Sequence, residues 1–552
     1  MSTIKSRILS KSEIEHRIAT GDAIVIYQDN VLKLNKWIDK HPGGDKAVYH
    51  LIGRDATDEM ISYHCDGTQS TFLRWSIGKI DHKYKWENFL PPIQGGIYRT
   101  YEEQNQQNDS ETSTLTASCT DSSTAPIGTS SVKIIPKAPQ CEILTKEKFY
   151  YFEKRVIRDP EDVIDNYDND LAIQDLNSIP SLDYKTQEFL SKKYNQLHEN
   201  VIAQGFYQCN YWCYFKEFCR ISSLMMFSAS LFKTNHLFFS AVLLGAAWQQ
   251  MTFIAHDAGH ISITHNYQID NLIGMTVADW FGGLSLGWWK RNHNVHHLIT
   301  NDPIHDPDIQ HLPFFAVSTR LFKNVYSTYY DKYLYYDKAA QYFIKFQDYL
   351  YYPVLCFGRF NLYRLSWTHL LLGLGPRKGK AAWFRYYELL GLSFFFYWFF
   401  YLIVYSRIDG WGARLQYVLV SHITTMVVHV QITLSHFAMS TSDLGVSESF
   451  VSKQLRTTMD VDCPEWFDYF HGGLQYQAIH HLFPRVPRHN FRKLQPLIID
   501  FCNEVGLKYT IYGFGKGNKE VINKLGEIAR QAKILADCTK SMKKEAQGFK
   551  RP

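Results

Sequence analysis

The chain has 552 residues, more than one domain usually holds, so we expect two or more domains. Aromatic residues make up 15% of it and the formal net charge is only +5, which is typical of a membrane protein and gives no support for a nucleic-acid partner. Ten scattered Cys without a CxxC pair indicate a reducing, cytosol-facing protein, and the N-terminus lacks the apolar run of a signal peptide.

A compact polar domain of mixed strands and helices is predicted over residues 1–92. Its most informative stretch is "HPGGDKAVYHLIGRDATDEMISYH", in which a tight turn follows His41 and a helix-loop-helix carries His64 back to face it. Two facing His are the ligands of a six-coordinate haem iron. An HPGG turn alone is often a plain surface turn, but "IGRDATDEM" and "SIGKI" at 76–80 favour the haem interpretation here. His50, between the two ligands, is expected on the surface.

The next segment, residues 93–142, is rich in Ser, Thr, Gln and Asn and poor in apolar residues, which predicts a flexible linker. Residues 143–552 are predicted to form an all-α integral membrane domain with a cytosolic helical cap. Four apolar segments are candidate transmembrane helices: 218–232 with the aromatics before it, 237–255, 386–405 and 411–437. The apolar stretch 348–373 is interrupted by Arg359 and Arg364 and is predicted to be interfacial or re-entrant.

Three His-rich boxes follow the membrane boundaries. "HDAGH" has the spacing i, i+4, and "HNVHH" and "QAIHH" have the spacing i, i+3, i+4, which places each set on one helix face. One such box is often only a set of exposed polar side chains on a helix surface. Three boxes on one predicted side of the membrane indicate a metal site. Seven imidazoles exceed the needs of one metal, and imidazole suits Fe, Zn and Cu alike. A two-metal site is the economical interpretation, and the predicted haem domain favours iron, since zinc has no redox use. The box residues are His256, His260, His293, His296, His297, Gln477, His480 and His481.

Two known families resemble this chain. Residues 10–90 resemble the cytochrome b5 family, with His41 and His64 at the axial-ligand positions. Residues 200–510 resemble the membrane fatty-acyl desaturases, in particular the front-end desaturases with an N-terminal cytochrome b5 domain, through "HNVHHLITNDPIHDPDIQHLP", "QLRTTMDVD" and "FHGGLQYQAIHHLFPRVPRHN". The third box of that subgroup begins with Gln, as it does here at Gln477. "TLSHFAM" resembles a further ligand segment of the family and adds His436 to the metal ligands.

This resemblance implies an O2-dependent lipid desaturase with haem b, two non-haem Fe ions and electrons from NADH via cytochrome b5 reductase. It also implies a multi-pass protein of the endoplasmic reticulum membrane, with the haem domain and the His boxes facing the cytosol. Within the family the chain is most similar to fungal Δ8 sphingolipid desaturases, which place a trans double bond in the long-chain base of ceramide. The alternatives are a front-end Δ5/Δ6-type fatty-acyl desaturase, a related di-iron lipid hydroxylase and a non-enzymatic haem carrier.

Several polar residues around the boxes are weaker candidates. Asp257, Asp306 and Asp308 are placed to hold ligand imidazoles through their second ring nitrogen, although the latter two are equally suited to structural turns. His471 and His489 flank the third box and are expected to help orient it. The remaining nearby His, namely His265, His305 and His311, are expected in loops or behind the ligands.

Overall fold

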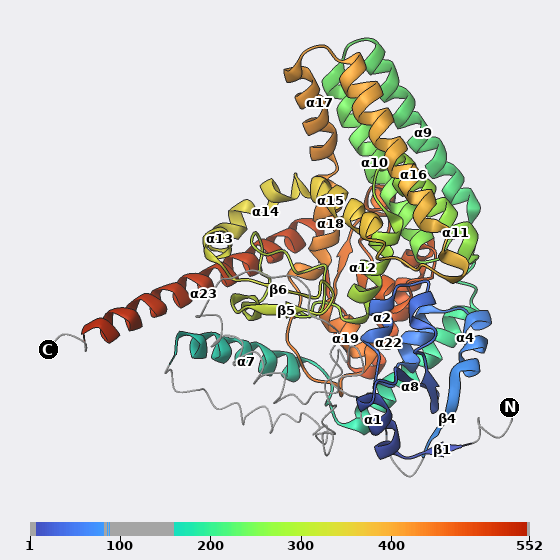
Figure 1. The fold of residues 1–552 in the computed structure, drawn as a ribbon, viewed down its shortest axis with the longest axis vertical. Helices are drawn as coiled ribbons and strands as arrows, with labels where there is room; N and C mark the ends of the chain where they lie inside the picture. The colour runs from blue at the N-terminus through green and yellow to red at the C-terminus, as the bar shows by residue number, and fades with distance from the viewer. Residues whose placement is uncertain (1–6, 82–85, 87, 89–158, 549–552) are drawn as a thin grey trace.

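The computed structural model describes residues 7–81, 86, 88 and 159–548. The predicted linker, residues 93–142, lies outside this range. Figure 1 shows the N-terminal domain in blue at the lower right, an upright helical bundle above it, and a layer of shorter helices and small sheets at the base of the bundle.

The N-terminal domain is a four-stranded sheet carrying short helices. The strand order is β1-β4-β3-β2, with β1 parallel to β4 and the other pairs antiparallel. Apolar side chains from β2 (Ile24–Tyr27) and α1 (Lys11–Ala19) form its core, because the strand "IVIY" is buried along its whole length. The other elements are β1 (Ile8–Leu9), β3 (Asn30–Lys33), α2 (Asp45–Tyr49), α3 (Thr57–Tyr63), α4 (Asp66–Phe72) and β4 (Ser76–Ile80).

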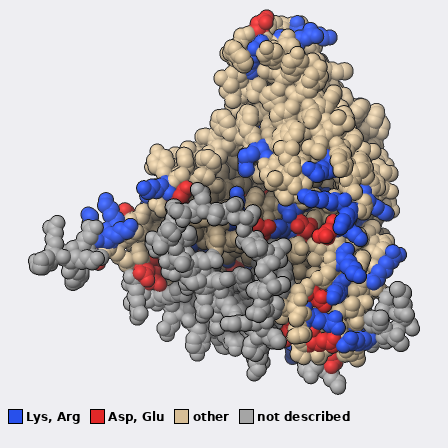
Figure 2. Space-filling model, in the orientation of Figure 1, with Lys and Arg blue, Asp and Glu red and all other residues tan. Residues whose placement is uncertain are grey.

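Long helices form the upright bundle: α9 (Tyr211–Lys233), α10 (Leu237–Gly259), α16 (Phe384–Phe396) with its continuation η7 (Tyr397–Tyr405), and α17 (Trp411–Thr424) with α18 (Met426–Phe437). Three helical segments of the described residues are long and apolar enough to cross a membrane, namely Leu237–Gly259, Gly379–Tyr405 and Trp411–Phe437. Figure 2 shows that the surface of the bundle is largely free of charge between its tip and its base.

The segment predicted as the first span, residues 218–232 with the aromatics before it, is not among these three candidate spans. Helix α9 has 23 residues and packs along α10, but it carries Lys216, Glu217 and Arg220 in its first half. Its later turns expose Met226 and Phe227. Three of the four predicted spans coincide with these candidate spans, and the fourth segment is a helix of the right length with too many charges.

The stretch 348–373 forms two shorter helices, α14 (Gln347–Leu355) and α15 (Gly358–Leu372), at the base of the bundle. Neither is among the candidate spans, in agreement with the prediction that this segment does not cross the membrane. Arg359 is buried, and its Nε donates to the Tyr363 hydroxyl at 2.9 Å. A cation inside an apolar stretch is thus held by internal hydrogen bonds.

The base consists of helices that support the His boxes. Helix α12 (Leu286–Leu298) is capped by Ser285, whose hydroxyl accepts from the Trp288 N–H. The third box lies on the short α21 (Gln477–Leu482), which is packed in a core with α8 (Tyr184–Ala203), α19 (Phe450–Thr457) and α22 (Phe491–Val505). The remaining elements are α7 (Pro160–Ser178), α11 (Tyr267–Met275), β5 (Val325–Ser327), β6 (Lys332–Leu334), α13 (Lys338–Phe343), β7 (Asp460–Asp462), α20 (Asp468–His471), β8 (Ile511–Gly513) and α23 (Phe514–Gly548).

Candidate metal and haem centres

Four helices bring the His boxes together into two adjoining groups. The end of α10, the middle of α12 and α21 contribute the first group, whose ligand atoms lie within 4.8 Å of one another: His256, His260, His293 and His480. Helices α12, α18 and α21 contribute the second group: His296, His436 and His481. The ring of His297 lies between the groups, with its centroid 4.7 Å from that of His480 and 4.1 Å from that of His481.

Several ring nitrogens of this cluster have the state that a metal requires. Burial lowers the pKa of His260, His297, His480 and His481 well below its ordinary value, so these imidazoles are neutral. Buried ring nitrogens without a hydrogen-bond partner occur among the described residues at His260 Nε2, His297 Nδ1, His436 Nδ1, His480 Nε2 and His481 Nε2. Neutral imidazoles with free nitrogens are metal ligands, so the cluster fits a pair of irons.

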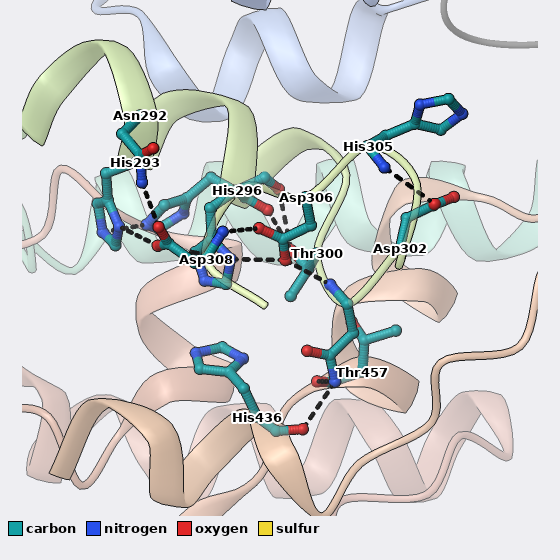
Figure 3. A network of polar contacts seen from close by, with 12 residues as sticks. Asn292, His293, His296, Thr300, Asp302, His305, Asp306, Asp308, His436 and Thr457 are labelled. Atoms are coloured by element: carbon teal, nitrogen blue, oxygen red, sulfur yellow. Dashed lines mark hydrogen bonds and ion pairs between the residues drawn. The ribbon is translucent and has the colours of Figure 1, made fainter. Parts of the chain in front are cut away.

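Carboxylates behind the second box hold its rings. The buried Asp306 accepts from His296 Nδ1 at 2.9 Å and from the Asn301 N–H at 2.8 Å (Figure 3). Asp308 lies 3.5 Å from His293 Nδ1 and accepts a short hydrogen bond from Asn292. Both Asp also belong to one turn, because Asp306 accepts from the Asp308 N–H. Asp306 and Asp308 therefore contact box imidazoles and also belong to a structural turn, which are the two roles that the sequence left open.

A buried ionic network supports the first box. Asp257 is 3.9 Å from His256 Nδ1, which is too long for a hydrogen bond, and it pairs closely with Arg488. Arg488 also pairs with Glu217, and His489 Nε2 lies 2.7 Å from the same carboxylate. His489, which is predicted to help orient the third box, contacts this network behind the first box.

Gln477 is buried at the first residue of α21, one helical turn before His480 and His481. This placement agrees with the i, i+3, i+4 pattern of the third box. Its role as a ligand stays a prediction.

His41 and His64 face each other in the N-terminal domain. Their ring centroids are 6.2 Å apart, with 50° between the ring planes. His41 Nδ1 lies 2.7 Å from the Gly44 carbonyl oxygen and His64 Nδ1 lies 2.9 Å from that of Met60, which leaves Nε2 of each ring for a metal. Burial lowers the pKa of His64 to about 3, so its imidazole is neutral. The pair fits a haem iron with two axial His.

The prediction that His50 lies on the surface is wrong. His50 is fully buried, with Nδ1 2.7 Å from the Lys46 carbonyl oxygen and Nε2 3.0 Å from the Thr328 hydroxyl. Beside it, Lys46 pairs with Asp331 at 2.7 Å. The surface of the N-terminal domain around His50 is covered by the loop between β5 and β6, which is distant in the chain.

The residues just before His64 contact the His boxes directly. The Tyr63 hydroxyl donates to the His297 carbonyl oxygen at 3.2 Å, and the two rings pack edge to face with centroids 5.9 Å apart. The Ser62 hydroxyl donates to the carbonyl oxygen of Leu482, which follows His481, at 2.8 Å. These two residues link the candidate haem site to the second and third boxes. Sequence reasoning did not identify them, because neither belongs to a motif.

Two family models match this chain. That of the fatty acid desaturases matches residues 234–513, and that of the cytochrome b5-like haem/steroid binding domain matches residues 10–87. The chain belongs to the fatty acid desaturase family and carries an N-terminal cytochrome b5-like domain, which confirms the resemblance drawn from the motifs.

The similar proteins include several fungal enzymes. The chain is 59% identical to a Delta 8-(E)-sphingolipid desaturase of Candida albicans, over 97% of this chain and 98% of that one. It is 61% identical to a protein of the same name from Lachancea kluyveri, over 98% and 96% of the two chains. An acyl-lipid (9-3)-desaturase of Borago officinalis is 35% identical, over 66% of this chain and 79% of that one.

Proposed function

We propose that this protein is an O2-dependent desaturase that inserts a trans double bond at carbon 8 of the sphingoid long-chain base of ceramide. The observation that carries the chemistry is the pair of adjoining His groups in contact with a domain that presents two facing His. The lipid is proposed from similarity, because the relatives named for this reaction match nearly the whole chain and the acyl-lipid relative matches two thirds of it.

Two irons are proposed at the paired His groups, the first held by His256, His260, His293 and His480 and the second by His296, His436 and His481. His297 and Gln477 complete the set. When bound, the iron pair supplies the oxidising power to remove two hydrogens from an unactivated hydrocarbon chain, which no side-chain acid or base supplies. The carboxylate of Asp306 bonds His296 at Nδ1, which leaves Nε2 of that ring for an iron in the second group.

Electrons are proposed to come from NADH through cytochrome b5 reductase and haem b, held between His41 and His64. Each turnover takes up two electrons and two protons, reduces O2 to two waters and removes two hydrogens from the lipid. Tyr63 and Ser62 position the haem domain on the second and third boxes through their hydrogen bonds. This contact keeps the two centres close, as transfer of single electrons requires.

We propose that the protein is a multi-pass protein of the endoplasmic reticulum membrane, with α9 as a fourth span and the haem domain and boxes in the cytosol. Four spans return the chain to the same side before each box. The exposed apolar side chains in the later turns of α9 support its contact with lipid. Residues 1–92, 93–142 and 143–552 are proposed as haem domain, linker and membrane domain.

The test is expression in a host that lacks such enzymes, followed by mass spectrometry of hydrolysed long-chain bases and of total fatty acids. We expect a new trans double bond at carbon 8 of the long-chain base only. His480→Ala with His481→Ala abolishes it and leaves the haem spectrum intact, whereas His236→Ala, at an exposed turn, changes neither. His41→Ala removes both the spectrum and the product.

Other products would favour the alternatives. A new bond near the carboxyl end of a fatty acid, with unchanged long-chain bases, would identify a Δ5/Δ6-type desaturase. A product heavier by one oxygen would identify a hydroxylase. A full yield of product from the His480→Ala and His481→Ala variant would contradict the metal site itself.

A further inference from the structure

The segment "QLRTTMDVD", residues 454–462, contacts the helices that carry ligands of the second metal group. It begins on α19 and ends on β7. The Met459 N–H donates to the Ser435 carbonyl oxygen of α18 at 3.1 Å, and the Asp460 carboxylate accepts from the Ala478 N–H of α21 at 2.8 Å. The segment therefore holds the backbone of both helices close to their His ligands.

Gln454, the first residue of this segment, is fully buried and uses both ends of its side-chain amide. Its Nε2 donates to the His297 carbonyl oxygen at 2.7 Å, and its Oε1 lies 2.9 Å from His481 Nδ1. The Thr300 hydroxyl is a second neighbour of His481 Nδ1, at the longer distance of 3.2 Å. One amide side chain thus connects the second box with the third.

These contacts determine where the His481 ring carries its hydrogen. A backbone carbonyl oxygen only accepts, so the amide nitrogen of Gln454 faces His297 and the amide oxygen faces His481. Because an amide oxygen also only accepts, His481 donates to it and carries its hydrogen on Nδ1. His481 Nε2 is then free, and it is buried without a hydrogen-bond partner among the described residues. This is the tautomer that binds a metal through Nε2.

The same carbonyl oxygen of His297 is an acceptor for the haem domain. Tyr63, one residue before the haem ligand His64, donates to it at 3.2 Å. A carbonyl oxygen has two lone pairs, so it accepts from Gln454 and from Tyr63 together. Gln454 therefore belongs to a continuous series of hydrogen bonds that connects Tyr63 with the ring of His481.

We infer that Gln454 is a positioning residue of the second metal group and that it links docking of the haem domain to the orientation of His481. Its amide oxygen keeps Nε2 of His481 available to iron, and its amide nitrogen holds the His297 carbonyl oxygen where Tyr63 reaches it. This inference rests on the proposed function, because the iron pair is part of that proposal. Without the acceptor, the His481 ring turns or moves its hydrogen to Nε2, which weakens one iron and leaves the first group intact.

The test uses variants of the full-length protein, purified with haem in lipid nanodiscs and loaded with Mössbauer-active iron. Gln454→Met removes both contacts at nearly constant volume. Gln454→Asn keeps the amide but is one methylene too short for both contacts, so it serves where the Met variant does not fold. Gln454→Glu keeps an oxygen for His481 Nδ1 and loses the amide donor.

Gln347→Met is the matched control. Gln347 is also fully buried, and its amide bonds the backbone of Ala316 and Leu525, which belong to no box. Four quantities are measured for every variant: the affinity of each iron in a chelator-buffered Fe(II) series, the Mössbauer spectrum, the rate at which the metal site oxidises the reduced haem, and the thermal unfolding temperature.

In Gln454→Met and Gln454→Asn we expect the affinity of one iron to fall roughly 10- to 100-fold, as loss of a group that holds a ligand ring does. The other iron keeps its affinity and its Mössbauer signal, and oxidation of the reduced haem slows. Gln454→Glu binds both irons like the wild type, because a carboxylate also accepts from Nδ1, but its haem is oxidised more slowly. Gln347→Met lowers the unfolding temperature and changes neither iron.

Three results would overturn the inference. One is wild-type affinity for both irons in the Met and Asn variants of Gln454. A second is a loss of iron from Gln454→Glu as large as that from Gln454→Met, because the acceptor oxygen would then not be what holds His481. A third is haem oxidation at the wild-type rate in Gln454→Glu, which would remove the link to the haem domain. Wild-type protein that binds no iron would instead contradict the proposed function.

Discussion

Asp306 shows how one side chain prepares a metal ligand. Its carboxylate is buried, accepts from His296 Nδ1 and is itself fixed by the Asn301 N–H. Asn301 in turn donates from its side chain to the carbonyl oxygens of His436 and Thr457. The orientation of His296 and the backbone next to His436 are thus linked through one turn.

Asp306→Asn is expected to weaken iron binding by roughly 10- to 100-fold, because it removes the negative charge behind the His296 ring and one of the two oxygens that accept from His296, Asn301 and Asp308. Iron per haem, measured by mass spectrometry on purified protein, checks this. Asp308→Asn is the companion variant and is expected to lose less iron, since Asp308 lies 3.5 Å from His293 Nδ1. Full iron content in Asp306→Asn, with unchanged haem, would show that the carboxylate is only a turn residue.

Tyr63→Phe is expected to slow oxidation of the reduced haem by the metal site, because it removes the hydrogen bond to the His297 carbonyl oxygen while keeping the ring. Stopped-flow absorbance of the haem, with ceramide and O2 present, measures the rate. The haem reduction potential and the rate of haem reduction by the reductase stay unchanged. Thr71→Val, which also removes a hydroxyl from this domain, is the control. Equal rates in both variants would exclude Tyr63 from positioning the domain.

The residue scale also shows what a sequence can predict. The His boxes follow from local spacing, because i, i+3 and i+4 share a face wherever the helix lies. Tyr63 and Ser62 contact residues 234 and 420 positions away, and no local pattern encodes such a contact. His50 was predicted on the surface for the same reason: its partner Thr328 lies 278 positions away.

Among the helices, α10 and α12 meet where the first two boxes face each other. Gly259, next to His260, allows this approach, since a Cβ there would lie 2.1 Å from the Trp289 ring. Trp289 in turn stacks on His293. The close contact of the two helices therefore sets the distance between the first and second boxes.

Gly259→Ala is expected to destabilise the protein by about 1–3 kcal/mol, as overpacking of a filled interior does, and to lower its iron content. Gly412→Ala is the matched control, because a Cβ on Gly412 in α17 meets no atom within 4 Å. Thermal unfolding and iron content, measured for both variants, test this expectation. A Gly259→Ala protein that behaves like Gly412→Ala would show that Trp289 moves aside without cost.

Hydropathy predicts the strongly apolar helices well and the first helix of the bundle poorly. The spans predicted at 237–255, 386–405 and 411–437 lie within the segments that the structure identifies. Helix α9 combines four charged residues with exposed apolar turns, so its length fits a span and its composition does not. Short helices such as α21 and the loop around Asp306 depend on tertiary packing, and their geometry was not predictable.

In the whole molecule, the haem domain packs against helices that carry the boxes. Its contacts include the Asp45–Arg291 pair and the Gly43 carbonyl oxygen, which accepts from Asn294 Nδ2 at 2.8 Å. Arg291 and Asn294 flank His293 on α12. The family resemblance predicts both domains from their motifs, but it does not predict this arrangement.

Asp45→Arg is expected to slow oxidation of the reduced haem, because it places two like charges in a partly buried pair. Adding Arg291→Asp restores an opposite pair and recovers part of the rate. A coupling energy of about 0.5–3 kcal/mol from this double-mutant cycle is expected, and the effect weakens in high salt. If the effects of the two substitutions on the activation free energy are additive, the two residues do not contact each other in solution.

The central claim is tested most directly with purified protein in nanodiscs and a ceramide whose long-chain base is deuterated at carbons 8 and 9. We expect the product to lose one deuterium from each carbon, to gain no oxygen and to carry a trans double bond between them, with NADH and cytochrome b5 reductase as the electron source. Retention of all deuterium in the long-chain base, or a product with one added oxygen, would contradict the account.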